Sequence, residues 1–256
     1  MPPQNSEDAQ SSKSSNKIRG VENKTAPKIE FHFLTLFPEV FSGILNSSLL
    51  GKAQSKGLVS FHTTQIRDFA TDKHHSVDDT PYGGGEGMLM KVDVLHAAWK
   101  SVVPEKTPGT ITLMTTPQGA KFDQDMAKEL AAKYQKIVLV CGHYEGVDER
   151  FIELCVDREV SIGDYVLTGG ELPALVIAEA TARLLPGVVG NERSLTEDSL
   201  EGGFLKYSQY TKPRTFEGLS VPEVLLSGDH KKVDVWRREQ MRERTARKRP
   251  DLKKSD

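Results

Sequence analysis

The alternation of apolar and polar positions divides the chain into three parts. Residues 1–27 are polar, rich in Ser, Asn and Gln, and almost free of large apolar side chains. Short apolar runs and amphipathic runs alternate from residue 28 to residue 189, after which the chain becomes polar and finally basic. A segment with so few apolar residues cannot offset the entropy that it loses on ordering. We therefore expect a disordered tail over residues 1–27 and a folded core from residue 28.

Several runs within the core have the composition of β-strands. They are residues 29–36, 58–66, 110–116, 136–141 and 158–162. The run KIVLVC at 136–141 is almost entirely apolar, which is typical of a strand that is covered on both faces. Because helical patterns separate these runs, the sequence predicts an α/β fold with a mostly parallel sheet.

The helical patterns begin and end at recognisable residues. Pro38 opens a helix that ends near Gly51 or Gly57. One apolar stripe of this helix comprises Val40, Phe41, Ile44, Leu45 and Leu49. Further helices are predicted over residues 91–101, from Asp123 to about Lys133, and from Asp148 onward. Residues 172–185 are apolar on nearly every side, so we expect a buried helix there.

The chain after residue 189 has a different character. Residues 190–203 are polar and resemble a flexible linker. A short helix is predicted in VPEVLLSG at 221–228 and a basic helix from about Lys231 to Lys248. The pattern thus predicts an α/β domain over 28–189, a linker over 190–203 and a small helical domain over 204–256.

The composition is that of an ordinary globular protein of 256 residues with a net charge of −2. Cys141 and Cys155 lie in apolar runs without a CxxC pattern, which favours buried free thiols in a reducing compartment. No apolar run reaches the length of a membrane span, and the N-terminus lacks the apolar core of a signal peptide. Glu7, Asp8 and Glu22 argue against a transit peptide. We expect a cytoplasmic protein without a membrane segment.

Charge is spread unevenly along the chain. Residues 230–256 carry 11 Lys and Arg against 5 Asp and Glu. A basic end of this kind binds a polyanion or is simply the solvated face of a helix, and the charge alone does not decide between these.

Three loops that follow predicted strands are rich in small residues. They are TTPQG at 115–119, CGHYEG at 141–146 and SIGDYVLTGG at 161–170. Ligands of open α/β sheets bind at the carboxyl ends of the strands, so the three loops are expected to line one pocket. Their glycines would let the backbone approach a flat ring and its ribose, and Glu145 could accept hydrogen bonds from ribose hydroxyls or from a cationic group. A fourth loop, PYGGGEGM at 81–88, fits neither the P-loop nor GxGxxG and is read as a mobile lid or a tight loop.

Motifs along most of the chain resemble those of the bacterial tRNA (guanine-N1)-methyltransferases, a family of the knotted SPOUT class. The motifs are FPE at 37–39, RDF at 67–69, DKH at 72–74, VDD at 77–79, PYGGG at 81–85, GHYEGVDER at 142–150 and SIGDYVLTGGELPA at 161–174. The resemblance runs from Phe31 to Arg249, and the last motif is long and specific. It implies a deep trefoil knot that holds S-adenosylmethionine in a bent shape, although knotted folds are rare exceptions.

The resemblance also implies which residues contact the cofactor. The matching positions are Thr115, Thr116, Pro117, Gly142, Glu145, Ile162, Gly163, Asp164, Tyr165, Val166, Leu167, Gly169 and Gly170. Members of the family are obligate homodimers with each active site built across the subunit interface, so residues 172–185 are expected to pack within and between subunits. A Mg²⁺ requirement is implied as well, but no carboxylate cluster marks a site by its spacing.

The implied reaction is methylation of N1 of the guanosine immediately 3′ of the anticodon, which maintains the reading frame. N1 of neutral guanine carries a proton, so the reaction needs a general base and a donor that faces O6. The resemblance assigns the base to Asp198 and an essential arginine to Arg183. Without the resemblance, Asp198 reads as a solvated acid and Arg183 as a charge that complements a helix dipole.

Two departures from the family pattern lie close to these motifs. His143 stands where the family usually has Arg, and Lys212 stands in a YTKP segment where the family has YTRP. A histidine titrates near neutral pH, and a lysine lacks the bidentate fork of arginine.

The basic C-terminal helix is expected to track phosphates of the tRNA anticodon stem-loop. The residues concerned are Lys231, Lys232, Arg237, Arg238, Arg242, Arg244, Arg247, Lys248 and Arg249. The target base would be flipped into the pocket. The alternative function is a non-catalytic RNA-binding protein with a degenerate SPOUT fold. A SPOUT ribose methylase is disfavoured because that class lacks the EDS linker and this C-terminal domain, and a Rossmann-type methyltransferase because its GxG fingerprint is absent.

Overall fold

A computed structural model describes residues 28–190 and 198–252 of the chain. The tail for which we predict disorder, residues 1–27, lies outside the described residues, and so do residues 191–197 of the predicted linker.

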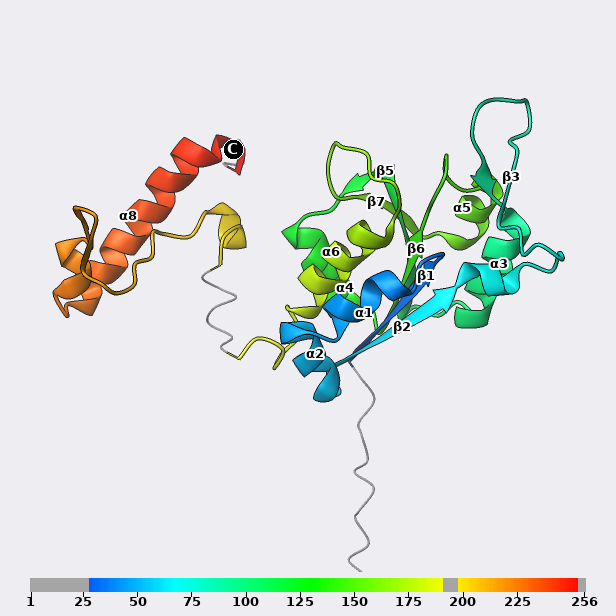
Figure 1. Ribbon diagram of the computed structural model, residues 1–256. Coiled ribbons are helices and arrows are strands. Elements are labelled where there is room, and N and C mark those ends of the chain that lie inside the picture. The colour runs from blue at the N-terminus through cyan, green and yellow to red at the C-terminus, as the bar shows by residue number, and fades with distance from the viewer. Residues whose placement is uncertain (1–27, 191–197, 253–256) are drawn as a thin grey trace, which may run out of the picture.

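The centre of the α/β part is a five-stranded sheet in the order β2-β1-β6-β5-β7, and every pair of neighbouring strands is parallel. The strands are β1 (Ile29–Thr35), β2 (Val59–Gln65), β5 (Thr110–Lys121), β6 (Lys136–Cys141) and β7 (Arg158–Ser161). Each contains one of the predicted runs or most of it, so the predicted parallel α/β sheet is confirmed (Figure 1).

Helices cover both faces of this sheet. The helices are α1 (Glu39–Leu45), α2 (Ser48–Ser55), α3 (Val92–Val102), α4 (Gln124–Lys133), α5 (Glu149–Cys155) and α6 (Glu171–Ala182). Buried side chains of α1, α2, α4 and α6 form one core cluster with one face of the sheet. Those of α3, α5 and the 3-10 helix η1 (Ile66–Phe69) form a second cluster on the other face. Covering on both faces explains why β6 is apolar throughout its buried length.

Two of the predicted helix starts are confirmed by their caps. The side chain of Asp123 accepts a hydrogen bond from the backbone N–H of Met126 at 2.9 Å. The side chain of Asp148 accepts one from the N–H of Arg150 at 3.0 Å. Each carboxylate satisfies a backbone donor that the first helical turn leaves free.

The single helix predicted from Pro38 is wrong, because the chain forms α1 and α2 with a turn between them. Gly51 does not end a helix but lies inside α2, where a Cβ would collide with the backbone carbonyl of Asn46. This glycine therefore permits the close approach of the preceding turn. Val40 and Ile44 of the predicted stripe are 41% and 44% exposed.

Strand β5 is longer than predicted, since it continues through the segment TTPQG that we expected to be a loop. Its pairing with β7 shifts register between Thr115 and Ala120. At Gly119 a Cβ would collide with the backbone of Glu159 and Val160 in β7. The glycine thus allows two backbones to approach closely beside an irregular stretch of the strand.

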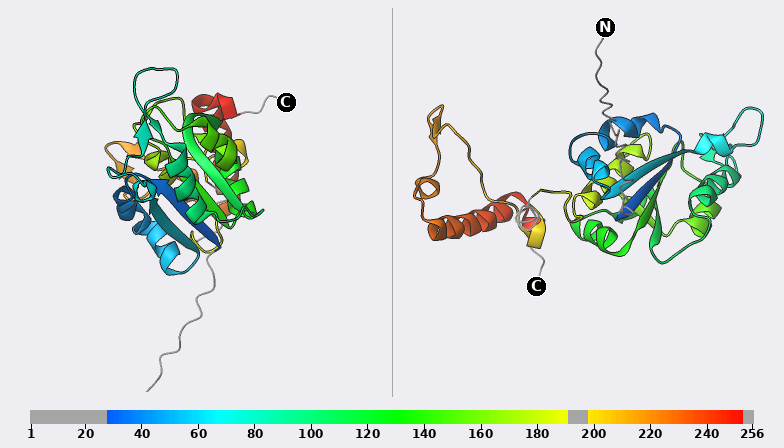
Figure 2. Two further views of the ribbon diagram at one scale, coloured as in Figure 1. Left: turned by 90° about the vertical axis from the view of Figure 1, so that its right-hand side faces the viewer. Right: turned by 90° about the horizontal axis from the view of Figure 1, so that it is seen from below.

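The remaining elements are short, apart from one helix. They are β3 (Asp78–Asp79), β4 (Leu89–Met90), η2 (Glu201–Gly203), β8 (Thr215–Phe216), β9 (Leu219–Ser220), η3 (Glu223–Leu226), α8 (His230–Lys248) and η4 (Pro250–Leu252). The predicted basic helix is α8, and the short helix expected at 221–228 is the 3-10 helix η3. The two views of Figure 2 draw the elements from η2 onward apart from the α/β part, on the side of the sheet that α1, α4 and α6 cover. Among the described helices, none is both long and apolar enough to cross a bilayer.

Candidate functional site

A cavity of about 340 Å³ lies beside the middle of β5 and the carboxyl ends of β6 and β7. Three segments that overlap the predicted glycine-bearing loops form most of its wall, namely residues 114–118, 142–147 and 159–170 except Asp164, whereas Gly119 and Cys141 of those loops are not part of the lining. The volume falls within the range of small-molecule sites, roughly 300–1,000 Å³. The parallel sheet therefore places three segments that are distant in sequence around one space.

All but one of the predicted cofactor-contacting residues line this cavity. The lining residues among them are Thr115, Thr116, Pro117, Gly142, Glu145, Ile162, Gly163, Tyr165, Val166, Leu167, Gly169 and Gly170. Asp164 departs from the expectation because it is not part of the lining. Its side chain is 96% exposed, and its carboxylate lies 3.9 Å from Nζ of Lys121.

The glycines of the third loop are explained by contacts between the loops. The backbone N–H of Gly170 donates to the carbonyl of Gly142 at 3.0 Å. A Cβ on Gly170 would collide with the Thr115 hydroxyl, and one on Gly169 would collide with the His143 imidazole. These glycines are thus required because neighbouring loops approach each other, which differs from the approach to a ligand that we expected.

Gly142 is different from the glycines of the third loop. A Cβ at Gly142 would meet no atom closer than the methyl carbon of Met114 at 3.7 Å. Both residues line the cavity, and no neighbouring segment requires a glycine at this position.

A hydrogen-bonded network of three side chains lies behind the cavity wall. Glu171, in the first turn of α6, is 6% exposed. Its Oε1 accepts a hydrogen bond from the Thr35 hydroxyl at 2.7 Å, and its Oε2 lies 2.9 Å from Nε2 of His143. Sequence reasoning missed Thr35 and Glu171. The signal was available, because Glu171 is a carboxylate at the start of an otherwise apolar helix and must have a partner.

Cys141 lies beside this network and carries no negative charge. It is fully buried, and burial together with the Glu171 carboxylate raises the pKa of its thiol well above the usual value. Cys141 and Cys155 are both buried and free, as predicted.

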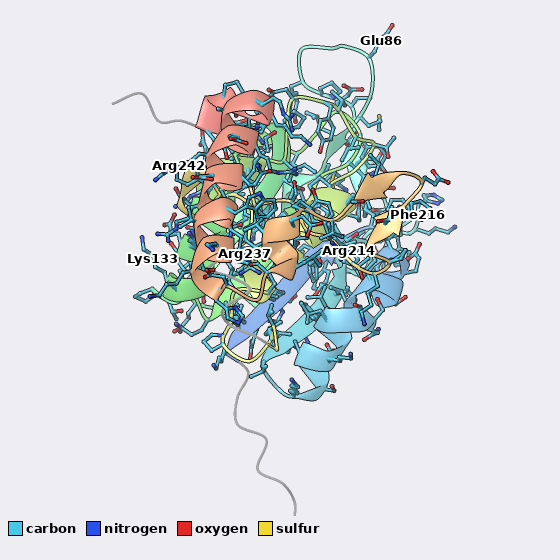
Figure 3. The ribbon with its side chains drawn as sticks, turned by 90° about the vertical axis from the view of Figure 1, so that its left-hand side faces the viewer. Glu86, Lys133, Arg214, Phe216, Arg237 and Arg242 are labelled. Atoms are coloured by element: carbon cyan, nitrogen blue, oxygen red, sulfur yellow. The ribbon has the colours of Figure 1, made fainter. Side chains whose placement is uncertain are left out.

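The glycine-rich loop at 81–88 contacts the cavity wall through Glu145. The backbone N–H of Glu145 donates to the carbonyl of Met88 at 3.0 Å. A Cβ on Gly87 would collide with the Glu145 side chain. At the far end of the loop, Tyr82 is 99% exposed and Glu86 points outward at the tip (Figure 3). The loop therefore touches the site at one end and leaves the other end in solvent.

The two predicted catalytic residues are brought together outside the cavity lining. Nη2 of Arg183, at the C-terminal end of α6, lies 2.9 Å from Oδ2 of Asp198. Nζ of Lys206 lies 3.5 Å from the other oxygen of the same carboxylate. The Arg183 and Asp198 side chains are 37% and 31% exposed, so the pair is accessible to a substrate.

The basic residues of α8 differ in their surroundings. The Arg237 guanidinium lies 4.7 Å from the centre of the Tyr207 ring, and Arg244 donates to the Lys206 carbonyl and to the Ser208 hydroxyl. Arg249 is paired with Asp251 at 2.6 Å. Arg242, in contrast, projects from the exposed side of the helix (Figure 3).

The site fits an organic cofactor better than a metal ion. The cavity combines apolar side chains such as Ile162 and Leu167 with the Thr115 and Thr116 hydroxyls and backbone groups of glycine loops. A flat base and a ribose need this mixture of apolar and polar contacts. Within the described part of the chain, no group of three or more His, Cys, Asp or Glu residues could hold a metal ion.

Comparison with known proteins gives a consistent result. The family model described as "tRNA (Guanine-1)-methyltransferase TrmD" matches residues 29–255. The chain is 52% identical over 226 residues to the tRNA (guanine-N(1)-)-methyltransferase of Carboxydothermus hydrogenoformans, and the match covers 88% of each chain. It is 50% identical over 224 residues to the enzyme of Staphylococcus carnosus, covering 88% of this chain and 90% of that one. The enzyme of Clostridioides difficile is 48% identical over 229 residues, with 88% and 98% covered.

Proposed function

Because this chain belongs to the TrmD family of tRNA (guanine-1)-methyltransferases, we propose that it transfers a methyl group from S-adenosylmethionine to N1 of a guanosine in tRNA. The target is the guanosine immediately 3′ of the anticodon, and its methylation maintains the reading frame. The observation that carries the proposal is the cavity formed by the three segments, inside a chain that matches the family over residues 29–255. The comparisons do not favour a non-catalytic RNA-binding protein. We place the enzyme in the cytoplasm.

Bound S-adenosylmethionine supplies the methyl group. The residues that would hold it are those of the three loops, and the space beside Gly142 would accommodate part of the molecule. Backbone groups of the loops would read the adenine edge, and Glu145 would accept hydrogen bonds from ribose hydroxyls. The described residues offer no cluster of ligands for Mg²⁺.

The chain's own part in the reaction concerns the proton on N1. Asp198 accepts this proton, and Arg183 stabilises the charge that develops on O6. The ion pair between the two residues supports these roles because it places a base and a cation within 2.9 Å of each other. Asp198 also lies near Lys206, so one cation can turn toward the guanine or a phosphate while the other still holds the carboxylate.

The position of this pair outside the cavity lining favours an active site shared by two copies of the chain. Four apolar side chains of the adjacent helices α1 and α6 are substantially exposed. They are Val40, Ile44, Leu172 and Val176, with exposed fractions of 41%, 44%, 54% and 44%. Exposed apolar side chains gathered on two helices that pack against each other favour an interface. We therefore infer a homodimer that covers the patch and brings Arg183 and Asp198 of one subunit to the cavity of the other.

We also infer the trefoil knot. After β7, at the edge of the sheet, the chain returns to α6, which packs against the central strands β1 and β6. On this path Gly170 is hydrogen-bonded both to Gly142 and to Thr115. A segment that is bonded both to β5 and to the residue after β6 on its way to α6 supports a threaded chain.

For tRNA we propose the exposed basic side of α8 as the phosphate-binding surface. Lys231, Arg238 and Arg242 are exposed there, and their spacing of seven and four positions places them on one side of the helix. Contacts of this kind give affinity and salt dependence without selecting the base, so the anticodon-loop guanosine must be recognised at the cavity.

The test is transfer of labelled methyl from S-adenosylmethionine to an unmodified tRNA that has two guanosines at the 3′ edge of the anticodon. A reverse-transcription stop at the second guanosine is expected, and the stop should vanish when this base is replaced by adenosine. A tRNA that is bound without methyl transfer would contradict the proposed activity and favour RNA binding alone.

A further inference from the structure

We propose that His143 is a positioning residue whose contact with Glu171 holds the loops of the cofactor cavity together and makes cofactor affinity depend on pH. The proposal rests on the S-adenosylmethionine site put forward above. It concerns binding rather than the transfer step, because His143 acts through the loops.

The network of Thr35, His143 and Glu171 connects three elements of the fold. Thr35 lies at the end of β1, His143 follows β6, and Glu171 begins α6. Thr35 also accepts a hydrogen bond from the backbone N–H of Phe37 at 2.9 Å, so its hydroxyl is fixed from two sides. The Glu171 carboxylate thus ties three segments together from a position that is almost inaccessible to water.

The His143 imidazole lies at the cavity, where residues of two loops meet. His143 lines the cavity beside Gly142, and Gly169 of the third loop packs directly against the imidazole. The Phe37 ring centre lies 5.0 Å from that of His143. Because the imidazole of the second loop packs against Gly169 of the third, its displacement would change the spacing of two loops that line the cavity.

Few ionisable groups surround His143 among the described residues. Glu171 is the ionisable group in direct contact with it among the described residues. From its own loop, Tyr144 presents a ring 6.3 Å away between centres, and Glu145 lies two positions along the chain. From β6 comes Cys141, an uncharged thiol, while the segment at 35–37 contributes only neutral groups.

Protonation of the imidazole therefore changes one interaction above all. A neutral imidazole offers the Glu171 carboxylate a hydrogen bond, whereas an imidazolium also offsets its charge, and a buried carboxylate is costly without a cation. Imidazoles change charge in the range of about pH 5 to 8. The network is consequently stronger at the lower end of this range, and the loops are then held closer to the geometry that binds the cofactor.

The experiment measures the dissociation constant of S-adenosylhomocysteine for the full chain by calorimetry at pH 6 and pH 8. For the wild type we expect binding roughly fivefold tighter at pH 6, a difference of about 1 kcal/mol. His143→Arg keeps a permanent charge and should bind equally well at both pH values, close to the wild type at pH 6. His143→Gln should bind at both as weakly as the wild type at pH 8, or more weakly.

Two further variants complete the test. His96→Gln removes an exposed imidazole of α3 and should keep the pH dependence of the wild type. Thr35→Val removes the second partner of Glu171 and should weaken binding at both pH values while the pH dependence remains. Melting temperatures without ligand identify any variant that does not fold.

The outcomes separate this inference from the proposed function. A wild type that binds equally at pH 6 and pH 8 and still methylates tRNA would overturn the role of His143 alone. A pH dependence that persists in His143→Gln would also overturn it, because another group would then titrate. A wild type that does not bind S-adenosylhomocysteine at all would overturn both the cofactor site and this inference.

Discussion

The cavity and the Arg183–Asp198 pair are built in opposite ways. The cavity lies at the ends of buried parallel strands, and behind it Glu171 is 6% exposed and hydrogen-bonded to two other segments. The Arg183–Asp198 pair joins the C-terminal end of α6 to Asp198, the first described residue after positions 191–197. Each of the two side chains is about one-third exposed. This difference indicates that the cavity proposed for the cofactor is already formed, whereas the two proposed catalytic side chains are held by charges that can exchange partners.

The most severe test of this difference is Asp198→Asn. An amide cannot accept the N1 proton, so we expect methyl transfer to fall at least about 100-fold. Affinity for S-adenosylhomocysteine should stay within about twofold, because Asp198 is not part of the cavity lining. Single-turnover methyl transfer and calorimetry measure the two effects.

The matched control is Glu223→Gln, which removes the carboxylate from another exposed pair, 2.7 Å from Arg214. It should retain the activity of the wild type. An Asp198→Asn enzyme with full activity would show that this carboxylate is not the base, and one that loses the cofactor as well would show that the two regions are not separate.

The second test asks whether the two regions meet only across a dimer. Val176→Arg introduces a charge into the exposed apolar patch on α6, where pairing with another copy would bury it. We expect the molar mass measured by light scattering to fall to that of one chain. Methyl transfer should fall roughly tenfold or more, as on loss of an interface hot spot.

Leu154→Arg provides the control, because Leu154 is 65% exposed on α5, which covers the other face of the sheet. This variant should leave both mass and activity unchanged. A monomeric Val176→Arg protein that methylates tRNA as well as the wild type would place the complete site within one chain.

The strand, the helix starts and the loops around the cavity were largely predictable from the sequence, because each depends on residues that are close together in the chain. The run KIVLVC presents apolar side chains on both faces of a strand, whatever the position of that strand in the sheet. Asp123 and Asp148 each cap a helix by accepting a hydrogen bond from a backbone N–H two or three positions further along the chain. The three glycine-bearing loops follow from the rule that parallel strands present their carboxyl ends at one edge.

What the sequence did not predict depends on contacts between distant segments. The continuation of β5 past Thr115 requires β7 as a partner, and Gly51 looks like a helix end until the carbonyl of Asn46 is placed beside it. The link from Thr35 to Glu171 spans 136 positions. Periodicity cannot reveal a pairing of that separation, although a carboxylate on an apolar helix indicates that some partner exists.

Two glycines of the loop at 81–88 test how firmly the cavity is formed before a ligand binds. Gly84 and Gly87 have φ values of +79° and +84°, so an alanine is strained similarly at both. At Gly84 a Cβ would meet nothing within 4 Å, whereas at Gly87 it would collide with the Glu145 side chain. Gly87→Ala should therefore displace Glu145 and weaken binding of S-adenosylhomocysteine roughly tenfold, about 1.4 kcal/mol.

Gly84→Ala should bind within about twofold of the wild type, since it carries only the backbone strain. Calorimetry on both variants isolates the contact with Glu145. The double variant Gly87→Ala/Glu145→Ala should bind no more weakly than Glu145→Ala. Equal losses in the two single variants would show that strain in the loop, and not the position of Glu145, controls the cavity.

The smallest expected effect concerns an ion pair that belongs to the preformed region but lies away from the cavity. Glu129 of α4 accepts hydrogen bonds from Arg158 of β7 at 3.0 and 3.2 Å and from Lys133 at 3.1 Å. These bonds, those from Arg158 above all, lower the pKa of Glu129 to about 2 from an ordinary value of 4.5.

A carboxyl whose pKa is depressed in the folded state stabilises that state above its unfolded pKa and loses the contribution as the pH falls toward the folded pKa. Glu129→Gln should therefore lower the melting temperature at pH 7 by roughly 1–3 °C, and the difference should narrow as the pH falls from about 4.5 toward 2. Glu153→Gln, at an exposed position of α5, should leave the melting temperature unchanged at every pH. A gap that stayed constant down to pH 3 would mean that Glu129 stabilises the fold through packing, and that the preformed region does not depend on this charge.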